Sequence, residues 1–165
     1  MGNSLVLLAL LCFVLLSGCC AIPGMGGGET NQTHLQEEVE IEIDPFSAHT
    51  GLAEAKEAVR TYASDAVLIT VYGVAESGGK SVQWEYTFNS MQNRKSYTIT
   101  IPGNSVRERP YSFMDALGED WMDSTDASSQ CHTPGEYSLE IAEGSPAWTV
   151  SFEGYACEAS SASPR

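Results

Sequence analysis

Residues 82–88 read Val-Gln-Trp-Glu-Tyr-Thr-Phe, and this stretch decides how the chain folds. Apolar side chains alternate with polar ones, so that Trp84, Tyr86 and Phe88 share one face. A period of two residues is typical of a β-strand with one buried face. We therefore expect a strand whose aromatic row packs into a core.

One more strand is expected before this stretch and one after it. Residues 66–72 are nearly all apolar, which indicates a central strand. The pair Gly78-Gly79 then predicts a hairpin turn. Residues 97–101 alternate again until Pro102 stops the strand. The three segments together predict an antiparallel sheet.

Helices are expected before and after these strands. Residues 51–63 place apolar side chains on one face, and Thr50 is the expected N-cap. A short second helix is expected from Asp123 or Ser124 through Cys131, whereas residues 103–122 show no clear pattern.

The remaining strands are expected at the two ends of the folded region. Residues 38–44 alternate strictly, and further strands are expected around Leu139 and Val150. The fold class predicted from these elements is α+β. It is a single domain in which a twisted antiparallel sheet carries a helix packed on one face.

The chain also contains an internal echo. Residues 84–88 and 148–152 share the order Trp, polar, apolar, hydroxyl, Phe, and each lies on the second strand of a predicted hairpin that follows a predicted helix. The echo favours two helix-plus-hairpin halves within one sheet. The alternative is chance, since amphipathic strands often look alike.

The first residues indicate export. Residues 5–16 form an apolar run whose helical length of about 18 Å is too short to cross a bilayer but suits a signal-peptide core. Leu16-Ser17-Gly18-Cys19 follows directly and resembles the lipobox of secreted lipoproteins. That resemblance implies cleavage before Cys19 and a diacylglycerol on its thiol. The alternatives are a signal peptide cut after Ala21 and an uncleaved anchor.

These signals define four expected segments. They are a lipoprotein signal peptide (1–18), a lipidated flexible tether (19–33), a folded α+β domain (34–158) and a disordered tail (159–165). The tether contains the sequon Asn31-Gln32-Thr33, so Asn31 is a candidate glycosylation site in an exported chain.

The charge of the chain restricts its partners. The formal net charge is −14, and every Lys, Arg, Asp and Glu lies after Cys19. Such a charge argues against binding nucleic acid, whose phosphates it would repel, and against electrostatic docking on anionic lipid. It suits a body held near a membrane by its anchor.

The five cysteines divide by position. Cys12 leaves with the signal, and Cys19 carries lipid in the lipoprotein interpretation. Cys131 and Cys157 are then the two cysteines of the folded region, and an oxidising exported setting predicts a disulfide between them. The alternative is two free thiols in a reducing host. Cys20 is left as either a second acylation site or a free thiol.

No catalytic, metal or cofactor site is predicted. Residues 74–81 nearly match a phosphate-binding loop, but that motif requires Gly at position 74, where Val stands, and a helix afterwards. Ser47, His49 and Asp44 lie too close in sequence for triad geometry.

Metal binding is disfavoured as well. His34, His49 and His132 show no ligand spacing. The carboxylates along residues 38–44 recur about 7 Å apart, which favours a solvated acidic face over a calcium site.

The layout resembles small secreted lipoproteins of the PepSY-like kind, which are also described as cystatin-like. The resemblance rests on residues 65–69, on Trp84-x-Tyr86-x-Phe88 and on residues 147–150. It implies a helix packed on a curled antiparallel sheet, and it suggests a module that restrains a peptidase. The chain departs from that pattern at its end, where a Ser-rich tail stands in place of an expected final strand.

The functional expectation is a non-enzymatic, lipid-anchored binding module on the outer side of the cytoplasmic membrane, which contacts an envelope protein or a peptidase. The alternative is a structural, envelope-maintenance lipoprotein without a specific ligand. An exposed apolar or aromatic patch would favour the first. Residues 1–4 lack Lys and Arg, which departs from the bacterial signal pattern and makes an archaeal host an alternative.

Overall fold

The computed structural model describes residues 42–160. Cys19, Asn31 and residues 38–41 of the expected first strand lie outside the described residues. The described part is an α+β fold with two helices and one sheet of seven antiparallel strands. Its elements, in chain order, are α1 (Ala48–Arg60), β1 (Val67–Ala75), β2 (Trp84–Ser90), β3 (Lys95–Ile101), β4 (Ser105–Pro110), α2 (Ser124–Cys131), β5 (Gly135–Ala142), β6 (Ser145–Phe152) and β7 (Tyr155–Ser160).

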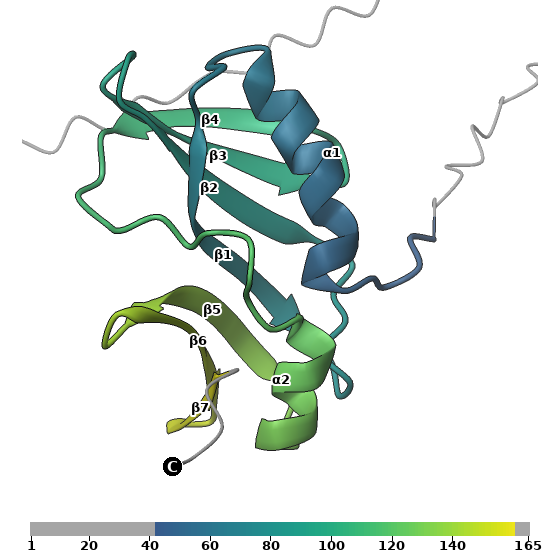
Figure 1. Cartoon of the computed structure of the whole chain (residues 1–165). Helices are drawn as coiled ribbons and strands as arrows, with labels where there is room; N and C mark the ends of the chain where they lie inside the picture. The colour runs from purple at the N-terminus through teal and green to yellow at the C-terminus, as the bar shows by residue number, and fades with distance from the viewer. Residues whose placement is uncertain (1–41, 161–165) are drawn as a thin grey trace, which may run out of the picture. The chain divides into compact units, whose positions relative to one another are not determined.

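The sheet has the strand order β4-β3-β2-β1-β5-β6-β7 (Figure 1). Every neighbouring pair is antiparallel. The two long strands β1 and β5 therefore meet in the middle, and each is followed outward by the strands that come next in sequence. Sequential neighbours pair because short turns join antiparallel strands directly.

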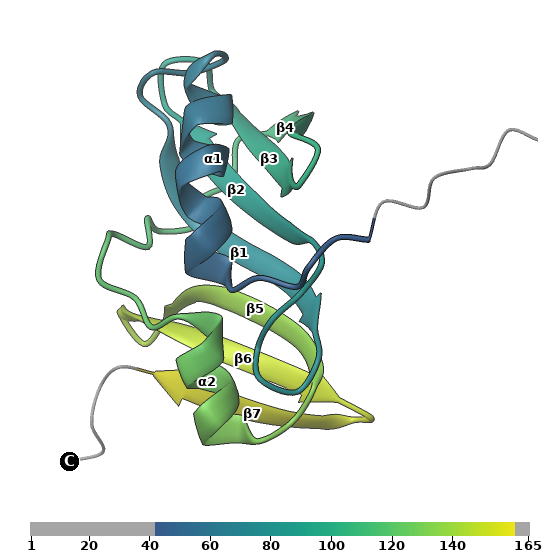
Figure 2. The same ribbon diagram turned by 90° about the vertical axis from the view of Figure 1, so that its right-hand side faces the viewer.

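Both helices lie on the same face of the sheet (Figure 2). The core between them is one cluster that includes Trp84, Tyr86, Tyr137 and Trp148, each fully buried. Among the described residues, the buried members of this cluster run from Ala48 to Ala159. The sequence predicts one helix packed on the sheet, or two if the chain consists of two helix-plus-hairpin halves. The structure has two helices on the sheet.

Two tryptophans tie the sheet to the starts of the helices. The Trp84 indole donates from Nε1 to the Phe46 carbonyl at 2.8 Å, and the Trp148 indole donates to the Met122 carbonyl at 2.7 Å. Each acceptor is the residue directly before a helix N-cap. The bonds fix where each helix leaves the preceding chain.

The start of α1 corrects two predictions. Ser47, not Thr50, is the N-cap, and the helix begins three residues earlier than expected. The reason is a β-bridge between Phe46 and Ser81, whose backbone hydrogen bonds of 2.9 and 3.0 Å hold Phe46 extended. Residues 42–44, the described end of the predicted strand 38–44, are irregular, and Ile43 is exposed.

The sequence does not predict two of the strands, β4 and β7. β4 exposes nearly all its side chains at one edge, so only Val106 carries an apolar signal. β7 forms the other edge and contradicts both the missing final strand and the start of the disordered tail at residue 159. Ala159 is fully buried in the core beneath the sheet edge, and the strand extends to Ser160. Its one large apolar residue, Tyr155, is exposed, and its buried residue Ala159 is too small to give an amphipathic signal.

The second helix and the β5–β6 hairpin agree with expectation. Asp123 is the N-cap of α2, which ends at Cys131, and β5 and β6 contain the predicted apolar rows. Neither described helix has the length and hydropathy that a membrane span requires.

Candidate binding groove

A groove of about 1050 Å³ crosses one end of the sheet. Its floor is a row of neighbouring residues on the face away from the helices, where Val74 of β1 pairs with Glu136, Glu136 with Ser151, and Ser151 with Ala156. The β1–β2 hairpin forms one wall, and the β6–β7 turn forms the other. We call this site the groove; it lies where β1 ends and β2 begins.

The groove gathers exposed apolar side chains. Tyr155 is 81% exposed and Val74 is 61% exposed, and Val82 and Phe152 are exposed beside them. Single exposed apolar residues are ordinary on a protein surface, whereas a cluster of them at one concave site makes that site a candidate for binding. The groove therefore provides the aromatic, apolar lining that binding sites use.

The rim of the groove is acidic. Glu76 and Glu153 line it, Glu136 lies on the floor, and Lys80 is the only cation among the described lining residues. The same field acts on Tyr72, two residues before Val74 on β1. Its pKa is raised by burial and then by the negative charges of Glu136 and Glu85. A ligand in the groove meets an excess of negative charge.

The hairpin wall is held rigidly. The Ser81 hydroxyl donates to the Val74 carbonyl at 2.7 Å, and the Gly78 N–H donates to the Ser128 hydroxyl of α2 at 3.0 Å. Gly79 has φ +68° and packs so closely on α2 that an added Cβ would lie 2.1 Å from the Ser124 carbonyl oxygen. Residues 74–81 therefore form the end of a strand and a hairpin turn that packs on α2. Their near match to a phosphate-binding loop reflects this turn and not a phosphate site.

The N-termini of the two helices meet behind this wall. The Asp123 carboxylate accepts hydrogen bonds from the Ser124 N–H at 2.8 Å and from the His49 N–H of α1 at 3.0 Å. Burial alone would raise the pKa of Asp123, but hydrogen bonds from the His49 N–H, the Ser47 hydroxyl and the Ser124 N–H are among the effects that outweigh it and hold the pKa below its ordinary value. Asp123 thus caps its own helix and stabilises the start of α1.

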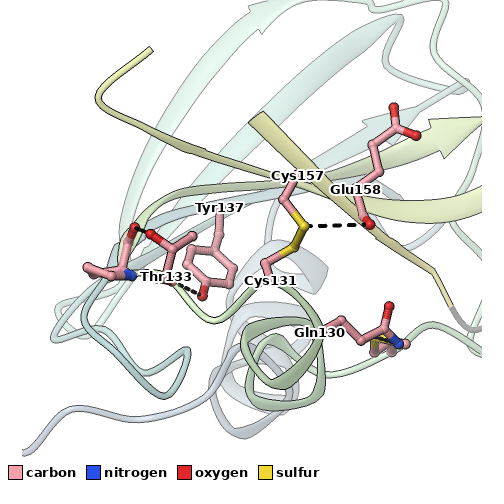
Figure 3. Close-up of a disulfide and its surroundings, with 8 residues drawn as sticks. Gln130, Cys131, Thr133, Tyr137, Cys157 and Glu158 are labelled. Carbon is pink, nitrogen blue, oxygen red and sulfur yellow. Dashed lines mark hydrogen bonds between the residues drawn. A yellow bond between two sulfur atoms is a disulfide. The ribbon is translucent and has the colours of Figure 1, made fainter. Parts of the chain in front are cut away.

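A disulfide joins Cys131 at the end of α2 to Cys157 on β7, as the cysteine count predicts (Figure 3). The residues are 26 positions apart. Beside it, the Tyr137 hydroxyl donates to the Thr133 carbonyl at 2.9 Å. The bond fastens the edge strand, which starts at one wall of the groove, to the helix layer.

The other sequence candidates do not assemble into a site. Ser47 hydrogen-bonds to Thr50, and the His49 ring packs edge-on against Trp121 at 4.0 Å. Residues 42–160 contain no cluster of three or more metal-ligating side chains. Cys19 and Asn31 lie outside the described part of the chain.

Sequence reasoning missed the groove residues. Phe152 and Val82 were assigned to strand faces, whereas the structure places them at strand ends where no helix covers them. The available signal was the apolar residue next to a turn, as in Gly154-Tyr155.

Comparison with known proteins adds no relative: no protein-family model, curated protein or solved structure matches the chain. The fold and the groove define an α+β protein with one seven-stranded antiparallel sheet and an apolar, acid-rimmed groove at one sheet end.

Proposed function

We propose that this chain is a non-catalytic binding module, held outside the cytoplasmic membrane by a lipid on Cys19, and that the groove is its binding site. The observation that carries the proposal is the gathering of Tyr155, Phe152, Val74 and Val82 around one concave site. A structural lipoprotein without a ligand has no use for such a cluster, which is costly to expose to water.

The partner is an apolar segment of an envelope protein or peptidase that carries Lys or Arg. Three glutamates of the groove lining against one lysine, Lys80, attract cations and repel acidic segments. The apolar side chains of the lining supply affinity by burial, while the glutamates select the charge of the partner and speed its approach.

The chain is further proposed to be PepSY-like, with two helix-plus-hairpin halves that form a structural repeat. Support comes from the order of elements, because α1 precedes β1 and β2 as α2 precedes β5 and β6. The matching hydrogen bonds of Trp84 and Trp148 give further support.

The groove is tested by cross-linking pull-down from native envelopes. Tyr155→Ser and Glu136→Lys should each lose the partner that the wild type recovers in stoichiometric amount. Tyr62→Ser is the matched control, because Tyr62 is 50% exposed but does not line the groove. Equal recovery by all four chains, or an empty pull-down from the wild type, would contradict the proposal and favour a structural role.

The anchor is tested separately. Mass spectrometry of the mature amino terminus should find a diacylated Cys19, and Cys19→Ser should release the chain from the membrane fraction. An unmodified terminus that begins after Ala21 would exclude the anchor without affecting the groove.

A further inference from the structure

A second cluster of exposed side chains lies at the opposite end of the sheet, around the β2–β3 turn and the end of β4. Ser112 is hydrogen-bonded there to side chains of both β2 and β3. Its N–H donates to the Ser96 hydroxyl at 3.0 Å, and its carbonyl accepts from the Asn89 amide at 2.8 Å. Phe113, the next residue, therefore follows a point fixed on Asn89 and Ser96, which flank the turn that contains Met91 and Arg94. In Figure 1 this turn and the arrowhead of β4 lie at the same end of the sheet.

The apolar members of this cluster are among the most exposed of the described residues. Phe113 is 95% exposed and Met91 is 77% exposed. Val67, at the start of β1, is 48% exposed at the same end. Covering such highly exposed large side chains with an apolar surface removes them from water and lowers the free energy of the system.

The same end concentrates the cations of the domain. Arg107 and Arg109 lie on one face of β4, and Arg109 pairs in register with Ser96. None of the ion pairs within residues 42–160 includes Arg94, Arg107 or Arg109, whereas Lys95 is paired with Glu108. By contrast, residues 110–160 contain ten Asp and Glu and no Lys or Arg.

We propose that Met91, Arg94, Arg107, Arg109 and Phe113, here named the turn-end patch, dock the domain onto the surface of an anionic lipid bilayer. Aromatic and thioether side chains suit the boundary between headgroups and acyl chains. Guanidinium groups bind phosphate oxygens in paired hydrogen bonds, so the arginines bind the lipid headgroups.

A bilayer is the occupant that the charge distribution selects. Three carboxylates belong to this end: Asp65, which accepts hydrogen bonds from Ser90 and the Gln92 N–H of the turn, Glu108, which is paired with Lys95, and Asp115. Four cations stand against them, so this end is the part of the domain that anionic lipid attracts, and the acidic remainder is repelled. The net charge of −14 argued against such docking only because it averages over both ends. Cys19 precedes Glu42 by 23 residues, a chain that spans at most about 80 Å, so an anchored chain reaches this orientation.

Docking sets the direction of the groove. β1 runs from Val67 at the turn-end patch to Ala75 at the groove, and nine residues of strand span about 30 Å. A domain docked by the turn-end patch therefore holds its groove away from the bilayer, open to partners. The docking itself does not depend on the lipid at Cys19.

The test is co-sedimentation of an unlipidated chain of residues 34–165, which contains all the described helices and strands, with vesicles. The wild type should bind vesicles of phosphatidylglycerol and phosphatidylcholine and not vesicles of phosphatidylcholine alone, and high salt should release it. Arg107→Gln with Arg109→Gln should weaken binding about 30-fold, since each cation contributes about fivefold. Phe113→Ser should weaken it as well.

The matched controls are Lys56→Gln with Lys80→Gln, which removes the same charge elsewhere, and Tyr155→Ser in the groove. Both should bind anionic vesicles as the wild type does, with melting temperatures measured for every variant. Equal binding of the wild type to the two kinds of vesicle, or an equal loss in the controls, would overturn the proposal. Those outcomes would leave the pull-down test of the groove unaffected.

Discussion

Trp84 and Trp148 lie with their ring centroids 5.9 Å apart and make the same hydrogen bond to two different helix starts. One indole accounts for the position of α1 and the other for that of α2. Because both rings are fully buried, the pair joins the two helix-bearing parts of the sheet in one core.

Replacing either of these tryptophans with Phe should be costly. Trp84→Phe and Trp148→Phe each remove ring volume and leave a backbone carbonyl without its donor. We expect each to lower the free energy of unfolding by about 2–4 kcal/mol in urea denaturation.

Trp121→Phe is the matched control for these variants. Trp121 is also buried, but its Nε1 has no hydrogen-bond partner within residues 42–160. It loses the same ring volume without breaking a bond, so its cost should be about 1 kcal/mol smaller. A loss as large as that of Trp148→Phe would show that packing alone explains these residues.

Gly51→Ala should destabilise α1. An added Cβ would lie 2.4 Å from the Tyr86 hydroxyl oxygen, which itself donates to the Ala48 carbonyl at 2.6 Å. We expect a loss of about 1–3 kcal/mol. In a Tyr86→Phe background the cost of Gly51→Ala should fall, as a double-mutant cycle will measure. Strict additivity would contradict the contact.

Asp123 should make stability depend on acid. Its pKa is held below the ordinary value, so its stabilising effect is present above the unfolded pKa and lost as pH falls through the lower folded pKa. Asp123→Asn keeps an acceptor and should cost about 1 kcal/mol at neutral pH. That difference from the wild type should shrink below about pH 4. A gap that stays constant from pH 7 to pH 3 would contradict the assignment.

The disulfide should contribute strongly to stability. Cys131→Ser with Cys157→Ser should lower the free energy of unfolding by about 3–4 kcal/mol, as expected for a closed loop of this length. Thermal melting with and without reductant measures the effect. Reductant should lower the melting temperature of the wild type only; an equal shift in the double variant would show that the loss has another origin.

Alternation and cysteine count predicted much of the fold. The aromatic row of residues 82–88 lies on β2 with its three rings buried, and Asp123 caps α2. Each of these elements has a buried face of large side chains, which leaves a period in the sequence. Cys131 and Cys157 were identified because few cysteines remain after the export signal is set aside.

The rest depended on contacts between distant segments. Ser47 replaces Thr50 as the cap because of the bridge from Phe46 to Ser81, which no local pattern reports. β4 and β7 are edges with weak apolar signals. The groove combines segments from four strands, so its members have no shared spacing in the sequence.

The most direct measurement of the groove's role is a selection of displayed random peptides on the immobilised wild-type chain, with Tyr155→Ser as the counter-selected surface. We expect the selected peptides to combine apolar residues with Lys or Arg, and to bind Glu136→Lys at least about tenfold more weakly, a loss of about 1.4 kcal/mol. Selected peptides that are acidic, or that bind Tyr155→Ser and Glu136→Lys as tightly as the wild type, would contradict a binding role for the groove.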